Sequence, residues 1–324
     1  MLLDIIMLIG GLVLILGGAN YLTDGASSVA RRAGISPLVV GLTIVAFGTS
    51  APELVISCVS AYNHSAGLAI GNVVGSNIFN ILVIIGLTSI VRPIVIERSI
   101  LVNDIPLVIL SSLVMLVMGN SVILNGDAAN VINRSDGIIL LLFFCIFMRY
   151  TFSQAKATPA DKDPASEDVP AKEMATWLSV ICILGGLAAL VWGGNLFVDG
   201  ASGIARRLNV SDAIIGLTIV ACGTSLPELA TSIVAAVKKQ PGLAVGNVVG
   251  SCIFNVFFVL GTAACISPLP LGKIGNVDLL TLTGASILFW IFGKAIGKMT
   301  FTRTEGALLF ACYVGYTVYL ILNV

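Results

Sequence analysis

Two segments of the chain, 41–80 and 216–255, are near copies of each other at a constant offset of 175 residues. The first contains GLTIVAFGTSAPEL and ends in GNVVGSNIFN, and the second contains GLTIVACGTSLPEL and ends in GNVVGSCIFN. Of the 40 aligned positions, 27 are identical. Each copy places one glutamate, Glu53 or Glu228, inside an apolar stretch. A charged side chain in hydrocarbon is costly, so we expect both glutamates to face a cavity and to have a function there.

The composition is typical of a protein that lies within a membrane. Apolar residues make up 57% of the chain and charged residues only 10%, whereas about 25% are charged in an average soluble domain. Apolar runs of roughly 17–22 residues recur along the chain and are long enough to cross a bilayer. The formal net charge is zero, which gives no indication of a nucleic-acid partner. We therefore expect a multi-pass protein in contact with lipid.

Ten membrane-spanning helices are predicted from these runs. Their expected ranges are 3–22, 38–61, 68–91, 101–118, 137–152, 176–198, 213–237, 243–266, 277–293 and 305–322. A long polar stretch with three prolines, Ser153–Lys172, follows the fifth range and predicts a solvated linker. The predicted domains are a first five-span repeat at 1–152, a linker at 153–175 and a second five-span repeat at 176–324.

The number of spans in each repeat sets the relative orientation of the two halves. Because five is odd, the second repeat must enter the membrane from the opposite side to the first. Inverted repeats are typical of secondary transporters, whose site lies near the midplane where the repeats meet. The predicted fold class is all-α integral membrane, with about ten transmembrane helices in two inverted five-helix repeats. We expect a single chain to be the functional unit.

The basic residues predict how the chain is oriented in the membrane. Thirteen lysines and arginines lie in or beside the loops that follow odd-numbered spans, and four lie beside the other loops. Basic residues are enriched in cytoplasmic loops. We therefore expect a cytoplasmic central linker, both termini outside, and a location in the bacterial inner membrane.

The second and third spans of each repeat carry polar residues at helical spacing. Thr49, Glu53 and Ser57 lie four residues apart and share one face of the second span. Pro52 has no N–H, so the carbonyl of Gly48 is left without its helical donor beside the glutamate. The remaining polar and helix-breaking residues of this pattern are Asn72, Ser76 and Asn80, followed in the second repeat by Gly223, Thr224, Pro227, Glu228, Ser232, Asn247, Ser251 and Asn255.

Other small and acidic residues predict structural roles. Glycines four residues apart allow close helix packing, and they occur in both third spans as Gly71, Gly75, Gly246 and Gly250. Ser57 and Ser232 are expected to pack or to bond their own backbone. Asp24 and Asp199 are expected at span ends. Asp104 and Asp278 are expected to be structural carboxylates at helix N-termini, where a negative charge is favourable.

Together these residues offer carboxylates, hydroxyls, amide oxygens and freed carbonyls to a ligand. An all-oxygen set suits a hard cation, and Ca²⁺ takes 6–8 oxygens in flexible geometry. Two carboxylates carry a charge of −2, which one Ca²⁺, two Na⁺ or two protons would cancel. A kinked helix with bonded hydroxyls can be purely structural, but two copies with a glutamate in each favour an ion or proton site.

The paired GTS-x-PE and GNVVGS-x-IFN segments resemble the repeats of the Ca²⁺/cation antiporter superfamily. The chain is similar, over nearly its whole length, to bacterial Na⁺/Ca²⁺ exchangers of the YrbG type. This resemblance implies Glu53 and Glu228 as ligands shared by Ca²⁺ and Na⁺. It also implies that the backbone carbonyls of Ala46 and Ala221 are cation ligands. The further side-chain ligands that it implies are Thr49, Ser50, Ser76, Asn80, Thr224, Ser225, Ser251 and Asn255.

Two positions depart from the pattern. Some members of the superfamily, including K⁺-dependent exchangers, carry aspartate where this chain has Asn255, so K⁺ cotransport is not expected. Cys252 stands where the first copy has Asn77. The resemblance also implies that the first and sixth spans, which we expect to be short and to end in DGAS segments, are the moving elements.

The predicted function is exchange of Ca²⁺ for Na⁺ by alternating access, with no cofactor and with inorganic cations as the only small-molecule partners. A H⁺-coupled cation antiporter is an alternative that the residues leave open. A cation channel is less favoured, because an inverted pair within one chain indicates a rocking transporter. An intramembrane enzyme is not expected, because His64 is the single histidine and lies in a loop.

Overall fold

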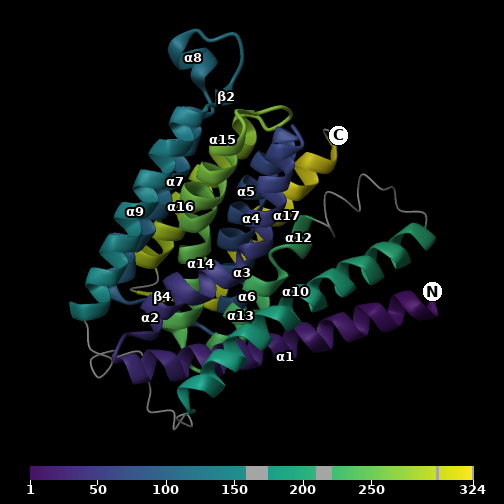
Figure 1. Ribbon diagram of the computed structural model, residues 1–324, viewed down its shortest axis with the longest axis vertical. Coiled ribbons are helices and arrows are strands. Elements are labelled where there is room, and N and C mark those ends of the chain that lie inside the picture. The colour runs from purple at the N-terminus through teal and green to yellow at the C-terminus, as the bar shows by residue number, and fades with distance from the viewer. Residues whose placement is uncertain (158–173, 209–220, 297–298, 323–324) are drawn as a thin grey trace.

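The computed structural model describes residues 1–157, 174–208, 221–296 and 299–322 (Figure 1). Within these residues, eight helices are long and apolar enough to cross a membrane, and a bent helix pair forms a ninth span. The predicted span 213–237 begins outside the described residues and continues as two short helices. The all-α fold with paired five-helix halves is therefore confirmed.

The first half contains helices, π-helical segments (labelled η) and two short strands. In chain order these are α1 Leu2–Ala33, α2 Pro37–Val40, η1 Gly41–Val45, α3 Ala46–Thr49, α4 Ala51–Tyr62, α5 Ala66–Phe79, η2 Asn80–Ile84, α6 Ile85–Val91, β1 Ile94–Val95, η3 Ile100–Asp104, α7 Ile105–Met118, α8 Ser121–Asn125, β2 Val131–Ile132 and α9 Arg134–Ala157.

The second half repeats this order. Its elements are α10 Thr176–Arg207, α12 Ala221–Gly223, α13 Leu226–Val237, α14 Pro241–Phe254, η6 Asn255–Leu260, α15 Gly261–Ile266, β3 Leu269–Pro270, α16 Asn276–Ile291, η7 Phe292–Ile296, β4 Thr300–Phe301 and α17 Arg303–Leu322. The exact limits of the two repeats and of the linker remain a prediction, and most of the linker lies outside the described residues.

The third spans of the two halves form the centre of the molecule. In the span 66–91, which joins α5, η2 and α6, 83% of the most apolar window is buried, and in 241–266 the value is 94%. In α9 and α17 it is only 17%. The two GNVVGS copies thus lie at the core, and the outer helices present apolar side chains to the lipid.

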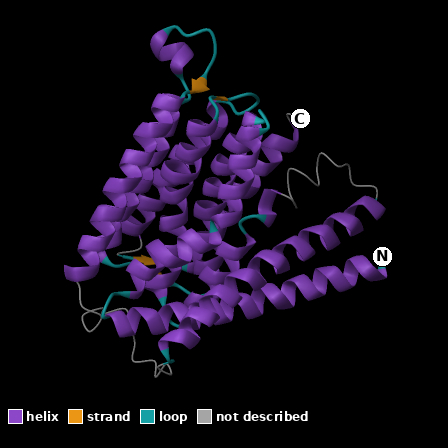
Figure 2. Ribbon diagram, in the orientation of Figure 1, coloured by secondary structure: helices purple, strands orange, loops and turns teal. Residues whose placement is uncertain are grey.

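Two small antiparallel ladders join the halves. β1 pairs with β4, and β2 pairs with β3, so each ladder takes one strand from each repeat. The two ladders lie at opposite ends of the helical bundle (Figure 2). This is the arrangement expected when one repeat is inverted relative to the other.

Helices α1 and α10 lie side by side across the remaining bundle (Figure 1). Three glycines at seven-residue intervals on each helix allow this contact: Gly11, Gly18 and Gly25 on α1, and Gly186, Gly193 and Gly200 on α10. A Cβ built on any of them would lie 2.5–2.8 Å from a backbone atom of the other helix. Real Cβ atoms do not approach this closely, so the two backbones meet only because side chains are absent.

The prediction that the first and sixth spans are short is wrong. Both α1 and α10 contain 32 residues and continue through their DGAS segments. Asp24 and Asp199 therefore lie within helices and not at span ends. The expected ends were placed too early because Asp24 and Arg31 interrupt the apolar run, although α1 ends only where Gly34 adopts a left-handed conformation with φ 64°.

Candidate functional site

Glu53 and Glu228 are both completely buried, with 0% of each residue exposed. Each lies in the first turn of a helix, α4 or α13, that follows a break in its span. The break in the first half bends the second span by 46°. Pro52 and Pro227 occupy the start of the two helices, where a missing N–H costs no helical hydrogen bond. Thr49 and Glu53 therefore belong to two helical segments and not to the single helix that was predicted.

Two asparagines brace these helix starts in the same way. Asn72 Nδ2 donates to the backbone oxygen of Glu53 at 3.2 Å and to Ser57 Oγ at 3.0 Å. Asn247 Nδ2 donates to the backbone oxygen of Glu228 and to Ser232 Oγ over the same two distances. The two serines accept hydrogen bonds and hold the asparagines. Their predicted packing role agrees with this arrangement.

Hydroxyls from one repeat contact groups of the other. Ser50 Oγ donates to Glu228 Oε1 at 3.0 Å, and Thr49 Oγ1 donates to Asn247 Oδ1 at 3.2 Å. Thr224 of the second break lies near the Glu53 carboxylate. The two helix breaks therefore meet, and the two carboxylates are close enough to repel each other.

Several buried polar atoms in this region have no hydrogen-bond partner among the described residues. They are Oε2 of Glu53 and of Glu228, both amide atoms of Asn80, Oδ1 of Asn255, and the hydroxyls of Ser225 and Ser251. Each such atom costs about 1–3 kcal/mol when it stays unpaired. Ser76 differs, because its Oγ donates to Glu53 Oε1 at 3.4 Å. Most of the unpaired atoms are oxygens, the ligands that hard cations prefer.

No positive side chain of the protein neutralises the two glutamates within the described residues. The ion pairs seen there have Asp4 and Asp24 as their acids, and neither glutamate takes part in them. The same part of the chain contains no group of three or more His, Cys, Asp and Glu side chains that could hold a metal. A cation at this position would be bound by two carboxylates and otherwise by neutral oxygens, which is the donor set predicted from the sequence.

Asn80 and Asn255 begin the π-helical segments η2 and η6. Such segments are rare and often lie at functional sites, and the sequence did not predict them. Asn255 Nδ2 donates to Asn77 Oδ1 at 3.1 Å, and Asn77 Nδ2 donates to the backbone oxygen of Cys252 at 2.9 Å. Asn77 was not predicted as part of the site. Its replacement by Cys252 in the second copy was the signal that could have identified it.

The structure gives less support to the two backbone carbonyls that were predicted as ligands, those of Ala46 and Ala221. The Ala46 carbonyl already accepts Ser50 N at 3.0 Å and Thr49 Oγ1 at 3.4 Å. Ala221 begins α12, directly after residues outside the described part. A ligand role for either carbonyl stays a prediction.

The glycines beside the glutamates are packing positions. A Cβ on Gly48 would lie 2.6 Å from the Leu187 side chain, and one on Gly223 would collide with Val198, so both helix breaks contact α10. A Cβ built on Gly246 would lie 2.7 Å from the backbone oxygen of Leu38, and one on Gly250 would lie 2.8 Å from that of Leu42. A Cβ on Gly71 would lie 3.5 Å from Ile274 Cδ1, and no described residue lies within 4 Å of a Cβ on Gly75, so close helix packing at these two glycines stays a prediction.

Asp104 and Asp278 were both expected at helix N-termini, and the structure places only one of these two aspartates there. Asp278 caps α16, because its Oδ2 accepts Gly275 N at 2.8 Å, and its predicted structural role is confirmed. For Asp104, the expected position at a helix N-terminus is wrong. Helical structure begins before Ile100, so Asp104 lies inside the helix at the end of η3, and it is 2% exposed.

The fold and the site define a class of protein. This is a multi-pass helical membrane protein with two inverted repeats that bring two buried carboxylates together. The chain belongs to the sodium/calcium exchanger family, whose model matches residues 3–153 and 178–322. The resemblance stated from the two repeats is therefore confirmed, and the family consists of membrane exchangers.

Individual relatives support the same conclusion. The inner membrane protein YrbG of Escherichia coli is 35% identical, over 86% of this chain and 83% of its own length. The sodium/calcium exchanger MaX1 of Methanosarcina acetivorans is 30% identical over 98% of both chains. A solved structure of the sodium–calcium exchanger NCX_Mj has a TM-score of 0.82 and 32% identity, and the match covers 98% of this chain and 99% of that one.

Proposed function

We propose that this protein exchanges Ca²⁺ for Na⁺ across the membrane at one shared site between its two repeats. The observation that carries the proposal is the pair of fully buried carboxylates, Glu53 and Glu228, without an internal cation among the described residues. An ionised carboxylate in an apolar interior is unfavourable unless a counter-charge is present. The transported cation supplies this counter-charge. The names of MaX1 and NCX_Mj support Ca²⁺ and Na⁺ as the cations.

The mechanism follows from competition for the same oxygens. One Ca²⁺ or two Na⁺ neutralises the charge of −2, and further Na⁺ can bind neutral oxygens. Ca²⁺ and Na⁺ cannot occupy the two carboxylates together, so one ion leaves before the other binds. The proposed ligands are the two glutamates and the hydroxyl and amide groups of Thr49, Ser50, Ser76, Asn80, Thr224, Ser225, Ser251 and Asn255. Neutralisation removes the cost of burying the charges while the site changes sides.

Alternating access requires an element that moves relative to the site. We propose α1 and α10, because α10 contacts both helix breaks through Leu187 and Val198, α1 packs closely along α10, and both helices are largely lipid-exposed. We further propose that the termini face outward, that the central linker is cytoplasmic and that one chain is sufficient for transport. The distribution of basic residues supports this orientation.

The test is cation flux in proteoliposomes under gradients imposed one at a time. Purified protein is reconstituted, and uptake of ⁴⁵Ca²⁺ is measured with an outward gradient of Na⁺, of K⁺ or of H⁺. We expect uptake to follow the Na⁺ gradient only. Uptake driven by H⁺ without Na⁺ would replace the proposal by a H⁺-coupled antiporter, because protons can also neutralise the two glutamates. Uptake driven by K⁺ alone would contradict it as well.

A further inference from the structure

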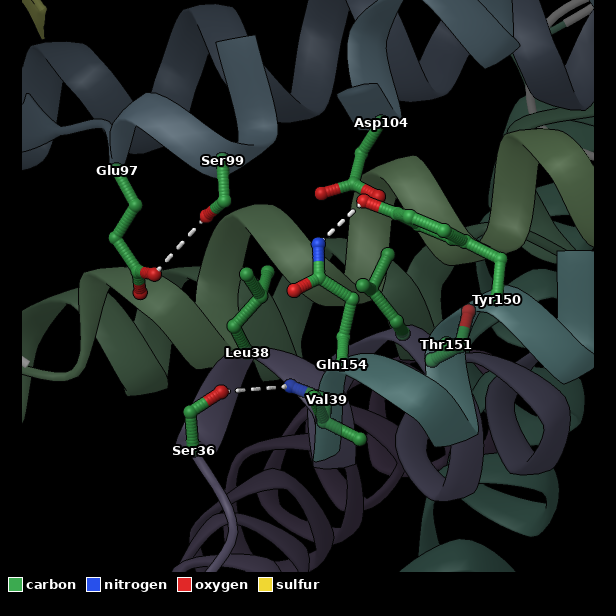
Figure 3. A pocket seen from close by; sticks show the side chains of 10 residues that line it. Ser36, Leu38, Val39, Glu97, Ser99, Asp104, Tyr150, Thr151 and Gln154 are labelled. Atoms are coloured by element: carbon green, nitrogen blue, oxygen red, sulfur yellow. Dashed lines mark hydrogen bonds between the residues drawn. The ribbon is translucent and has the colours of Figure 1, made fainter. Parts of the chain in front are cut away.

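An acidic cavity lies away from the two glutamates, between the second, fourth and fifth spans (Figure 3). Its volume is about 20 Å³, enough for one water molecule or one dehydrated ion. Its polar lining consists of Ser36, Glu97, Ser99, Asp104, Tyr150, Thr151 and Gln154. Leu38, Val39 and Leu42 complete the wall.

Asp104 is the key group of this cavity. It is 2% exposed, and its Oδ1 has no hydrogen-bond partner among the described residues. The carboxylate of Glu97 lies close enough to act on it electrostatically. A buried carboxylate oxygen without a donor is unfavourable. Asp104 therefore needs a ligand that the described side chains do not supply.

Two donors of this lining are already bonded to oxygens other than those of Asp104. Gln154 Nε2 donates to Tyr150 Oη at 2.6 Å, which leaves the amide oxygen of Gln154 for another partner. Ser99 Oγ donates to Glu97 Oε2 at 3.3 Å. Figure 3 shows the polar ends of Asp104, Tyr150 and Gln154 close together, with Glu97 to one side, bonded to Ser99.

The second repeat provides a comparison. Asp278 also lies near a tyrosine of the last span in its half, and both of its oxygens are bonded. Oδ2 accepts Gly275 N, and Oδ1 accepts Tyr316 Oη at 2.7 Å. Asp278 is thus bonded at both oxygens, whereas Asp104 keeps an unpaired oxygen beside a cavity.

We propose that the Asp104 cavity is a second binding site for one hard metal cation. Asp104 supplies the carboxylate, Tyr150 and Gln154 supply neutral oxygens, and Glu97 adds a second negative charge nearby. Hard cations bind such oxygen sets, and Ca²⁺ and Na⁺ share this chemistry. A bound cation would join the fourth and fifth spans to the start of the second span, at Leu38 and Leu42. The same span continues to Thr49 and Glu53. A cation bound in the Asp104 cavity would therefore restrict movement of the span that carries the Glu53 site.

The experiment measures binding and not transport, in purified full-length protein at constant ionic strength. Equilibrium binding of ⁴⁵Ca²⁺ and, separately, of ²²Na⁺ is measured in the E53Q/E228Q background, which lacks the proposed transport ligands. We expect this variant to retain one saturable cation per chain, and the isotope that binds identifies the ion. Adding D104N should remove this cation, whereas adding D278N should leave it. Size-exclusion profiles and Tm values verify that each variant is folded.

A milder variant covers the case in which D104N does not fold. In the E53Q/E228Q background, Tb³⁺ bound in the cavity should show luminescence when tyrosine is excited, because Tyr150 lines the site. Y150F should reduce this signal at least several-fold, and Y316F should not.

The possible results separate the two sites. If E53Q/E228Q binds neither Ca²⁺ nor Na⁺, the inference is wrong and the cavity takes only a proton or water. If D104N leaves the remaining cation in place, the inference is also wrong. If E53Q/E228Q retains every cation of the unmodified protein, the proposed transport site fails. In that case, loss of one cation on D104N would still support the second site.

Discussion

The two halves of the site agree closely at one pair of positions and differ at another. Asn72 and Asn247 make the same two hydrogen bonds over the same distances, 3.2 and 3.0 Å. Asn77 and Cys252 occupy equivalent positions but have different chemistry. The first pair braces each glutamate within its own repeat. The second pair lies where the repeats meet, because Asn77 donates to the backbone of Cys252 itself.

This difference shows how a duplicated site loses its symmetry. Asn72 and Asn247 each bond the glutamate of their own repeat, and both copies have remained asparagine even though Asn247 also accepts from Thr49 of the other repeat. At the interface, a side chain meets the equivalent position of the other repeat, and the space holds one long side chain more easily than two. Asn77 fills it and binds Asn255, whereas Asn80 receives no hydrogen bond from the described residues. The site thus has one fixed amide and one unpaired amide.

The largest expected effect tests whether both repeats are required. Glu53→Gln and Glu228→Gln should each reduce Na⁺-driven ⁴⁵Ca²⁺ uptake by at least about 100-fold, because each removes half of the charge that binds Ca²⁺. Asp199→Asn changes an exposed carboxylate and is the control, with unchanged uptake. Normal uptake in either glutamine variant, with intact folding by circular dichroism, would show that one repeat is sufficient.

The next effect tests the difference between Asn77 and Cys252. Asn77→Ala releases Asn255 and should weaken Ca²⁺ affinity by about 10–100-fold, as is typical when a group that orients a metal ligand is lost. Cys252→Ala should change affinity less than about three-fold, because the hydrogen bond from Asn77 is made to the backbone oxygen. Calcium titration of the flux rate measures both. Equal effects of the two variants would mean that the asymmetry has no role in binding.

A third comparison tests a feature that both repeats share. Gly18 and Gly193 are equivalent by the offset of 175, and a Cβ on either would lie 2.7 or 2.8 Å from a carbonyl oxygen of the facing helix. Alanine at either position should lower the free energy of unfolding by about 1–3 kcal/mol through overpacking. Gly17→Ala and Gly185→Ala are controls, since nothing lies within 4 Å of a Cβ there. They should be neutral or stabilising by up to about 1 kcal/mol. Chemical denaturation in detergent distinguishes the two groups.

Much of the architecture was predictable because apolar run length and the offset of 175 follow directly from the bilayer and from duplication. The glutamates and their oxygen-rich neighbours were predictable for the same reason. The failures have local causes. The lengths of α1 and α10 depend on glycine contacts between helices, and the period of seven in Gly11, Gly18 and Gly25 was not used. The unpaired state of Asp104 depends on where η3 begins, which apolar periodicity does not determine.

The smallest effect concerns a contact that only one repeat makes. Lys238 Nζ binds Asp24 Oδ1 at 2.7 Å and the backbone oxygen of Asn20 at 3.1 Å, which ties α1 to the turn before α14. The equivalent of Lys238 in the first repeat is Asn63, which cannot form an ion pair with Asp199. Both charged groups are partly exposed, so the pair contributes about 0.2–1 kcal/mol and is weakened by salt.

If α1 moves during transport, Lys238→Ala should change the exchange rate by less than about five-fold, and the change should disappear at high ionic strength. Asn63→Ala is the matched control and should have no effect at any ionic strength. A salt-independent loss in Lys238→Ala would indicate that the lysine acts through packing or its bond to Asn20, and not through the charge of Asp24.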